Sequence, residues 1–165
     1  MDAAMRGREV EEYFDAVAPA MRRTAYLVVR DWHTAEDMVQ ASFVKLYVAW
    51  PRIHEAGRDA YARRTLMNTC LSHLRKHRRE TVSDLIADRA DGAAGPDLDV
   101  SRALALLPPR QRAVVALRYL DDLSVGQVAD ALGMAPGTVK SQTARALERL
   151  RTLLPQLSLD EEVAR

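Results

Sequence analysis

The stretch SVGQVADALGMAPGTVKSQTARALERLR, residues 124–151, has the pattern of two short helices joined by a tight turn. Three placements in it meet the needs of a helix-turn-helix. Ala129 is small enough to let the two helices approach, Gly133 tolerates the positive φ of the turn, and the branched Val139 fixes the second helix. A helical hairpin with merely solvated charges is the plainer alternative, but the basic outer face of the second helix favours DNA binding.

Both helices of this stretch also begin with a suitable residue. Ser124 is a good helix cap, and Pro136 suits a first helical turn. On the outer face, Lys140 and Arg145 suit phosphates or guanine edges, and Gln142 can pair with adenine in two ways. The residues expected to contact DNA here are Arg118, Thr138, Lys140, Ser141, Gln142, Arg145 and Arg149.

The composition favours a helical protein throughout. Apolar residues make up 48% of the 165 residues, and the 7 glycines and 7 prolines are few, so most of the chain should fold. The abundant alanine, leucine and arginine favour helix, and we find no run of alternating apolar residues that would indicate a β-strand. The single cysteine excludes an intramolecular disulfide. Since we also find no membrane-length apolar run and no leader pattern, we expect a cytoplasmic protein.

The net charge of +1 hides two basic segments around an acidic one. The summed charge is +3 over residues 1–80, −4 over 81–99 and +4 over 100–154. The acidic part contains Gly92, Gly95 and Pro96, which is typical of a flexible linker. We therefore expect an all-α protein with a first domain at 1–80, an acidic linker at 81–100, a helix-turn-helix domain at 101–154 and a tail at 155–165.

Two helix starts outside the helix-turn-helix are also suggested by the sequence. In TAEDMVQASFVKLYVAW, residues 34–50, Thr34 is expected to cap a helix with Asp37 completing a capping box. Gln40 should face away from the apolar stripe of this helix. Ser101 is the expected cap of the first helix in the second domain.

A third long helix, expected over residues 59–80, carries more positive charge than one solvated face needs. Single strands bind to positive grooves with stacking rings and polar groups that grip an extruded base. Tyr47, Trp50 and Tyr61 are candidate rings, although taken alone they are better explained as core and Asn68 as a solvated helix residue. The polar and basic candidates on this helix are Arg63, Arg64, Asn68, Thr69, Arg75, Lys76, Arg78 and Arg79.

Binding strength argues that the helix-turn-helix does not act alone. A small module buries about 600–1,000 Å² on DNA, and non-specific contacts give dissociation constants of roughly 0.1 mM to 1 µM. Free repressors gain affinity by dimerising, yet no heptad zipper follows residue 154. The first domain is the candidate for supplying the missing affinity.

The order of these pieces resembles an extracytoplasmic-function (ECF) sigma factor of bacterial RNA polymerase. The resemblance covers about residues 8–153 and rests on TAEDMVQASFVKLY, ARRTLMNTCLSHLRKHRR, the acidic linker, LPPRQRAVVALRYLDDLS and GTVKSQTARALERLR. It implies that the first domain binds the polymerase clamp and melts the minus-ten promoter element. The second domain would dock on the polymerase flap and read the minus-thirty-five element, and an anti-sigma factor is a further expected partner.

The resemblance also implies roles for individual residues. Asp37 and Gln40 would face the coiled coil of the largest polymerase subunit, although helix capping and plain solvation also explain them. Asn68 and Thr69 would capture a flipped minus-ten base, and the linker would thread toward the active-site cleft. The duplex edge would be held by Arg75, Lys76, Arg78 and Arg79, and the minus-thirty-five contacts would be Arg118, Lys140, Ser141, Gln142 and Arg145.

The sequence departs from the family in ways that leave its promoter open. Ala135 stands where the family often has serine before the recognition helix, and Gln142 where it often has arginine. The stretch CLSHLRKH, residues 70–77, also differs from the family's usual tryptophan or arginine-rich run. No promoter sequence is therefore borrowed from the resemblance.

Other readings of the sequence remain open. Cys70, His73 and His77 share one helix and invite a zinc hypothesis with His33, but the surrounding positive charge disfavours a metal. A free-standing helix-turn-helix regulator and an adaptor made of two helical bundles are the competing classes. We find no catalytic constellation, so we expect no enzyme activity, no cofactor and no metal.

Overall fold

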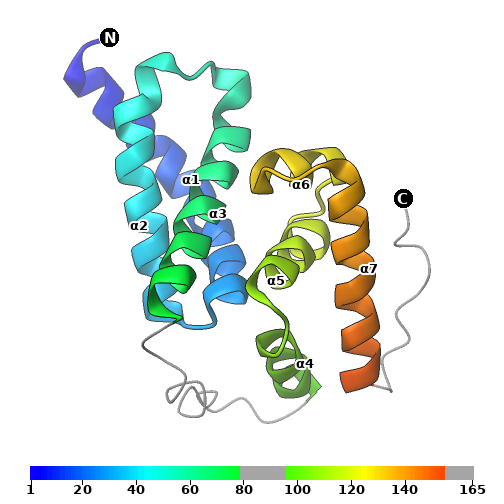
Figure 1. Cartoon of the computed structure of the whole chain (residues 1–165). Helices are drawn as coiled ribbons and strands as arrows, with labels where there is room; N and C mark the ends of the chain where they lie inside the picture. Colours follow the sequence, from blue (N-terminus) through cyan, green and yellow to red (C-terminus); the bar gives the residue numbers. More distant parts are fainter. Residues whose placement is uncertain (79–95, 155–165) are drawn as a thin grey trace.

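The computed structural model describes residues 1–78 and 96–154, and these parts contain helices and turns but no strand. The expected all-α fold is confirmed for the described residues (Figure 1). The first group of helices comprises α1 (Ala3–Val29), α2 (Trp32–Ala49), the short 3₁₀ turns η1 (Trp50–Arg52) and η2 (Glu55–Gly57), and α3 (Arg58–His77). The second comprises α4 (Pro96–Ala105), α5 (Pro109–Val115), the π-helical turn η4 (Ala116–Leu120), α6 (Val125–Leu132) and α7 (Pro136–Leu153).

The first group, which we call lobe one, is built around the inner faces of α1, α2 and α3. Trp50 and Leu46 of the α2 stripe and Leu66 and Met67 of α3 are fully buried. The apolar stripe expected on α2 is confirmed by the burial of Met38, Val39, Phe43 and Leu46, whereas the neighbouring Tyr47 is partly exposed.

The start of α2 differs from the expectation. Asp31, not Thr34, is the N-cap, and its carboxylate accepts hydrogen bonds from both the backbone N–H and the hydroxyl of Thr34. The helix begins earlier than expected, so Thr34 is its third residue and Asp37 takes no part in the cap. The hydroxyl and then the backbone N–H of Thr34 hold the pKa of Asp31 below its ordinary value.

The second group, lobe two, begins with a second correction. Ser101 lies inside α4 rather than at its start, and its hydroxyl accepts a hydrogen bond from Arg30 of lobe one. Pro109 opens α5, where proline suits the first helical turn.

The helix-turn-helix itself is confirmed in detail. Ser124 and Gln127 form a reciprocal capping box at the start of α6. Gly133 ends α6 with a φ of 62°, a conformation that a side chain would strain. Ala135 precedes α7 without a side-chain cap, and Pro136 opens the helix.

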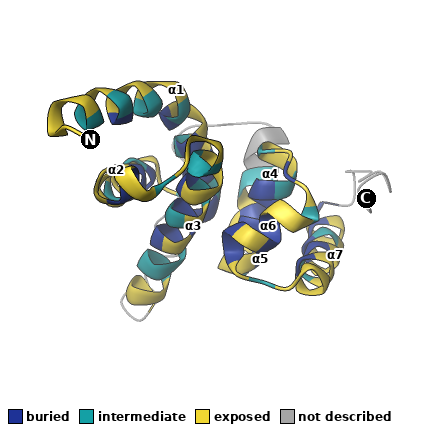
Figure 2. Ribbon diagram, turned by 90° about the horizontal axis from the view of Figure 1, so that it is seen from above, coloured by how far each residue is buried: buried dark blue, intermediate teal, exposed yellow. Residues whose placement is uncertain are grey.

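The two lobes share one apolar core. Buried residues of α3 such as Leu66 and Met67 belong to the same cluster as Leu117 and Val128 of lobe two. Helix α3 lies against α6, and α1 lies against α5 and η4. Buried residues line the facing sides of these helices, and exposed residues cover the outside (Figure 2).

Candidate nucleic-acid interface

Helix α7 presents the polar face expected of a recognition helix. Val139 and Thr143 are buried against the other helices of lobe two, and the Thr143 hydroxyl donates to the Val139 carbonyl of its own helix. Gln142 is half-buried, so only part of its amide faces solvent. The exposed candidates on α7 are Thr138, Lys140, Ser141, Arg145 and Arg149.

Position along α7 separates these candidates by reach. At about 1.5 Å per residue, Arg149 lies roughly 20 Å beyond Pro136, whereas the major groove is only about 12 Å wide. Recognition helices contact base edges with their N-terminal residues. Lys140 and Ser141 lie in the N-terminal half of α7, whereas Arg149 lies near its C-terminal end.

Arg118 has a structural partner that the sequence did not indicate. It lies in η4, and its guanidinium Nη1 donates a hydrogen bond to the carbonyl of Leu123, just before the cap of α6. The side chain is half-buried. Arg118 therefore ties η4 to the residue just before the cap of α6.

Asn68 and Thr69 of α3 have different environments. Asn68 is exposed, whereas Thr69 is only 8% exposed. The Thr69 hydroxyl donates to the Thr65 carbonyl at 2.7 Å and accepts from Lys45 Nζ at 3.1 Å. In this arrangement Asn68 faces solvent, and Thr69 instead anchors Lys45, a cation that the sequence analysis left out of the site.

The basic residues of α3 fall into two sets. Arg75, Lys76 and Arg78 are exposed at the C-terminal end, and Arg79 lies outside the described residues. Arg64 instead donates from Nε to the carbonyl of Asp130 in α6, at 3.1 Å. Arg63 is half-buried and lines a cavity between the lobes.

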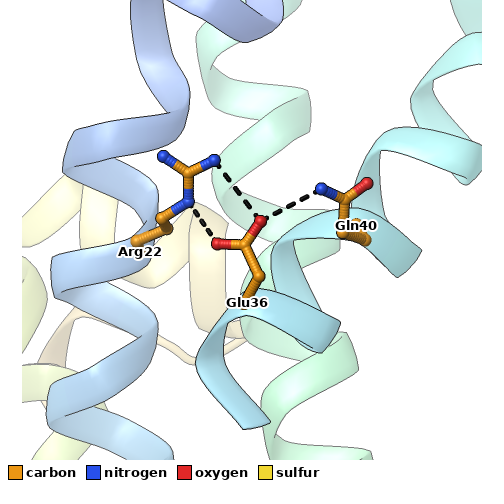
Figure 3. A network of polar contacts seen from close by, with 3 residues as sticks. All are labelled: Arg22, Glu36 and Gln40. Atoms are coloured by element: carbon orange, nitrogen blue, oxygen red, sulfur yellow. Dashed lines mark hydrogen bonds and ion pairs between the residues drawn. The ribbon is translucent and has the colours of Figure 1, made fainter. Parts of the chain in front are cut away.

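Helix α2 carries a polar network around Glu36. Its carboxylate pairs with the guanidinium of Arg22 on α1 and accepts a 3.0 Å hydrogen bond from the Gln40 amide (Figure 3). Arg22 foremost, and then Gln40, lower the pKa of Glu36. Asp37 is exposed beside this network, and the network fixes the direction of the Gln40 side chain.

The aromatic candidates differ in how far they are exposed. Trp50 is 1% exposed, its indole N–H donates to Glu9 at 2.8 Å, and Arg58 lies over its ring. It is therefore a core residue and not a stacking platform. Tyr47 and Tyr61 keep partly exposed rings.

Two family models match this chain, Sigma-70 region 2 at residues 13–80 and Sigma-70 region 4 at residues 97–150. An RNA polymerase sigma-E factor of Streptomyces avermitilis is 37% identical, over 92% of this chain and 88% of that protein. The ECF RNA polymerase sigma factor SigM of Mycobacterium tuberculosis is 32% identical, over 88% of this chain and 76% of that protein. The chain belongs to the ECF sigma factor family.

A solved structure is similar to this sigma factor across both lobes. The sigma factor RpoE of Bartonella quintana, in complex with the anti-sigma factor NepR, matches with a TM-score of 0.73 and 26% identity. The match covers 90% of this chain and 98% of that chain. It therefore includes the helix-turn-helix and the helices of lobe one in a single superposition.

The residues of the zinc hypothesis do not form a metal site in this sigma factor. Cys70 is fully buried, and burial raises its pKa to about 12. His73 and His77 stack on each other with ring centroids 4.1 Å apart. Within residues 1–78 and 96–154, no group of three or more His, Cys, Asp or Glu side chains could hold a metal ion.

Over the same described residues, none of the helices has both the length and the apolar character needed to cross a membrane.

Proposed function

We propose that this sigma factor binds core RNA polymerase, directs it to promoters by recognising minus-ten and minus-thirty-five elements, and promotes strand opening. The observation that carries this proposal is the presence of two cationic helix faces, α3 and α7, in segments that match Sigma-70 regions 2 and 4. Its work is binding and positioning, without a catalytic step of its own. It acts where the bacterial polymerase is, in the cytoplasm.

We assign the minus-thirty-five contacts to the N-terminal half of α7. Lys140 and Arg145 are exposed cations on that face, and Ser141 and Thr138 are exposed hydroxyl-bearing neighbours. Gln142 contributes its exposed part to base reading. Arg118 and Arg149 contact DNA phosphates. Arg118 is held by its hydrogen bond to the Leu123 carbonyl, and Arg149 lies roughly 20 Å from Pro136, farther than the major groove is wide.

We assign the minus-ten contacts to α3. Asn68 is the exposed amide that binds a flipped base. The neighbouring Thr69 contributes by accepting a hydrogen bond from Lys45, which positions that cation beside it. Arg75, Lys76 and Arg78 hold the phosphates at the duplex edge, and Arg79 is proposed to do so from sequence alone. Arg63, which lines the cavity between the lobes, and the exposed Arg64, which bonds the Asp130 carbonyl, are the further proposed minus-ten contacts.

We assign the polymerase contact to α2. Asp37 is exposed, and Gln40 is held in place by Glu36, itself fixed by Arg22. A hydrogen-bonded amide beside an exposed carboxylate suits a polar protein interface. An anti-sigma factor is the further partner that we infer, supported by the likeness to RpoE in its complex with NepR.

Run-off transcription tests the proposed function. Core RNA polymerase is incubated with a library of randomised promoter templates, with and without this chain, and the transcript starts are sequenced. We expect starts that depend on the chain and share two upstream elements. A chain that binds duplex DNA with a nanomolar dissociation constant in the absence of polymerase, and that adds no transcript starts in its presence, would instead be a free-standing regulator.

A further inference from the structure

A cavity lies at the seam, where α1 and α3 of lobe one face the η4 turn of lobe two. Its volume is about 370 Å³, and all three segments contribute to its lining. Ligand pockets measure about 300–1,000 Å³ and occur preferentially where domains meet and between packed helices. The cavity is at the small end of this range, which favours a compact ligand.

The floor of the cavity is apolar. Met21 of α1, Leu66 of α3 and Leu117 of η4 line it, and all three side chains are buried in the shared core. Covering such a floor with another apolar group removes both surfaces from water, which favours binding. A ligand for this cavity therefore needs an apolar body.

Three charged side chains line the same cavity, namely Asp59 and Arg63 of α3 and Asp121 at the end of η4. Asp59 is exposed, and its Oδ1 accepts a hydrogen bond from the Tyr13 hydroxyl at 2.7 Å. Asp121 is half-buried, and its Oδ1 accepts from the Thr24 hydroxyl at 2.8 Å. Arg63 is half-buried as well. The two charges that are shielded from water are therefore those of Asp121 and Arg63.

Arg63 and Asp121 line one cavity but do not pair with each other. Burial raises the pKa of Asp121, against the smaller opposing effects of the Thr24 hydroxyl and of the Arg63 charge. Arg63 forms no ion pair and no hydrogen bond with any residue in the described parts of the chain. Each of these two side chains thus lacks an oppositely charged group in contact with it, although the charge of one acts on the other across the cavity.

A zwitterion satisfies both side chains at once. A guanidinium binds a carboxylate through two parallel hydrogen bonds, and an ammonium group has three donors for carboxylate oxygens. A simple cation would leave the guanidinium without a partner, and a simple anion would leave the carboxylate without one. An α-amino acid carries its carboxylate and its ammonium on the same carbon, beside a side chain that can cover an apolar floor.

We propose that the cavity is a binding site for a free apolar α-amino acid, whose carboxylate pairs with Arg63 and whose ammonium pairs with Asp121. Its side chain covers the apolar floor. The inference goes beyond the proposed function and does not depend on it. Because the ligand contacts helices of both lobes in the folded chain, it raises the midpoint of thermal unfolding as its concentration increases.

The site is tested on the full-length chain with ¹³C-labelled methionine methyl groups, titrated with L-leucine and followed by NMR. Met21 and Met67 line the cavity, whereas Met38 of α2 is also buried but does not line it. Leucine should shift the signals of Met21 and Met67 to saturation and leave that of Met38 unchanged.

Three further probes each lack one part of leucine. Glycine lacks the apolar side chain, 3-methylbutylamine lacks the carboxylate, and 4-methylpentanoate lacks the ammonium group. Each should bind at least about tenfold more weakly than leucine, because it leaves the floor or one charged side chain without its partner.

Two variants test the charged side chains. Asp121→Asn and Arg63→Gln each remove one charge, and each should weaken leucine binding about tenfold. The matched controls are the neighbouring residues, which do not line the cavity. Asp122→Asn keeps a positive φ of 53° that asparagine tolerates, and Arg64→Gln removes the next cation of α3. Both controls should bind leucine as the wild-type chain does, with circular dichroism confirming that every variant keeps its helices.

The proposal would be overturned by methionine signals that do not respond to leucine. It would also be overturned by a response that 3-methylbutylamine or 4-methylpentanoate reproduces with equal affinity, or by test and control variants that bind leucine equally well. Each of these results would leave run-off transcription, and hence the proposed function, unaffected.

Discussion

Asp121 carries a carboxylate whose charge is penalised at the lobe seam. Burial raises its pKa above the ordinary 3.8, and this outweighs the opposing effects of the Thr24 hydroxyl and then of Arg63 and Arg23. Because the folded state holds the proton more tightly than the unfolded state, this group adds stability at low pH. That stability is lost as the pH rises from 3.8 through the raised pKa.

Asp121→Asn should therefore raise the midpoint of thermal unfolding at neutral pH, because asparagine keeps the acceptor for Thr24 and carries no charge. Melting curves recorded by circular dichroism at several pH values check this. The gain over wild type should shrink as the pH falls toward 3.8. A variant that is less stable than wild type at neutral pH would show that the charge of Asp121 is needed at the seam.

Ser124 is expected to matter through its capping box alone. Ser124→Ala should cost about 1 kcal/mol of unfolding free energy, or about 2–4 °C in a chain of this size. Ser141→Ala is the control, since that hydroxyl bonds a carbonyl of its own helix. Equal melting points for the two variants would mean that the cap contributes nothing measurable.

Residue-level predictions succeeded where a local rule decides the outcome. Ser124, Gly133 and Pro136 have the roles that their chemistry indicated. The predicted cap of α2 was wrong, because Asp31 and Thr34 are both residues that commonly cap helices. Only the backbone shows which of them precedes the helix. The partner of Thr69 could not be predicted, because Lys45 reaches it from another helix.

We expect strand opening to depend on the Asn68 amide of helix α3. Asn68→Ala should leave closed promoter complexes intact and slow strand opening about tenfold, since gripping an extruded base contributes about 1–3 kcal/mol. Permanganate footprinting of the holoenzyme on a promoter found by the run-off screen measures this. Thr65→Ala is the matched control on the same helix, because its hydroxyl bonds only the Tyr61 carbonyl among the contacts described here. Unchanged opening in Asn68→Ala would remove the base-capture role.

Helix α7 should supply sequence dependence but not polymerase affinity. The double variant Lys140→Ala with Arg145→Ala should lose the preference for the upstream element and keep core binding. Each lost phosphate contact lowers the slope of log affinity against log salt by about 0.9. Arg149→Ala should leave the upstream preference intact, because Arg149 lies roughly 20 Å from the start of α7. Loss of core binding in the double variant would reassign this face to the polymerase.

At the scale of elements, long helices with one apolar stripe were predictable. The stripe of α2 and the inward face of α7 follow from helical periodicity. The prediction that Ser101 caps a helix was wrong, because the chain is already helical before Ser101. That earlier segment has an acidic composition typical of a linker. Residues 81–95 of the expected linker, and the tail at 155–165, lie outside the described residues.

For the whole molecule, the charge pattern predicted two lobes, but it did not predict that the lobes pack against each other. The apolar residues of α3 that face lobe two look the same in sequence as those that face α1 and α2. Arg112 also reads as an ordinary helix cation, and only the fold shows it 8% exposed with three carbonyl acceptors. Burial, and then the nearby charge of Arg30, lower its pKa to about 10, so it remains a cation at neutral pH.

The central claim is that this sigma factor directs core RNA polymerase to promoters through two cationic helix faces, on α3 and α7. The most direct test is run-off transcription by core RNA polymerase, with and without this chain, on a library of randomised promoter templates. We expect transcript starts that depend on the chain and share two upstream elements. Starts that are the same with and without the chain would contradict the claim.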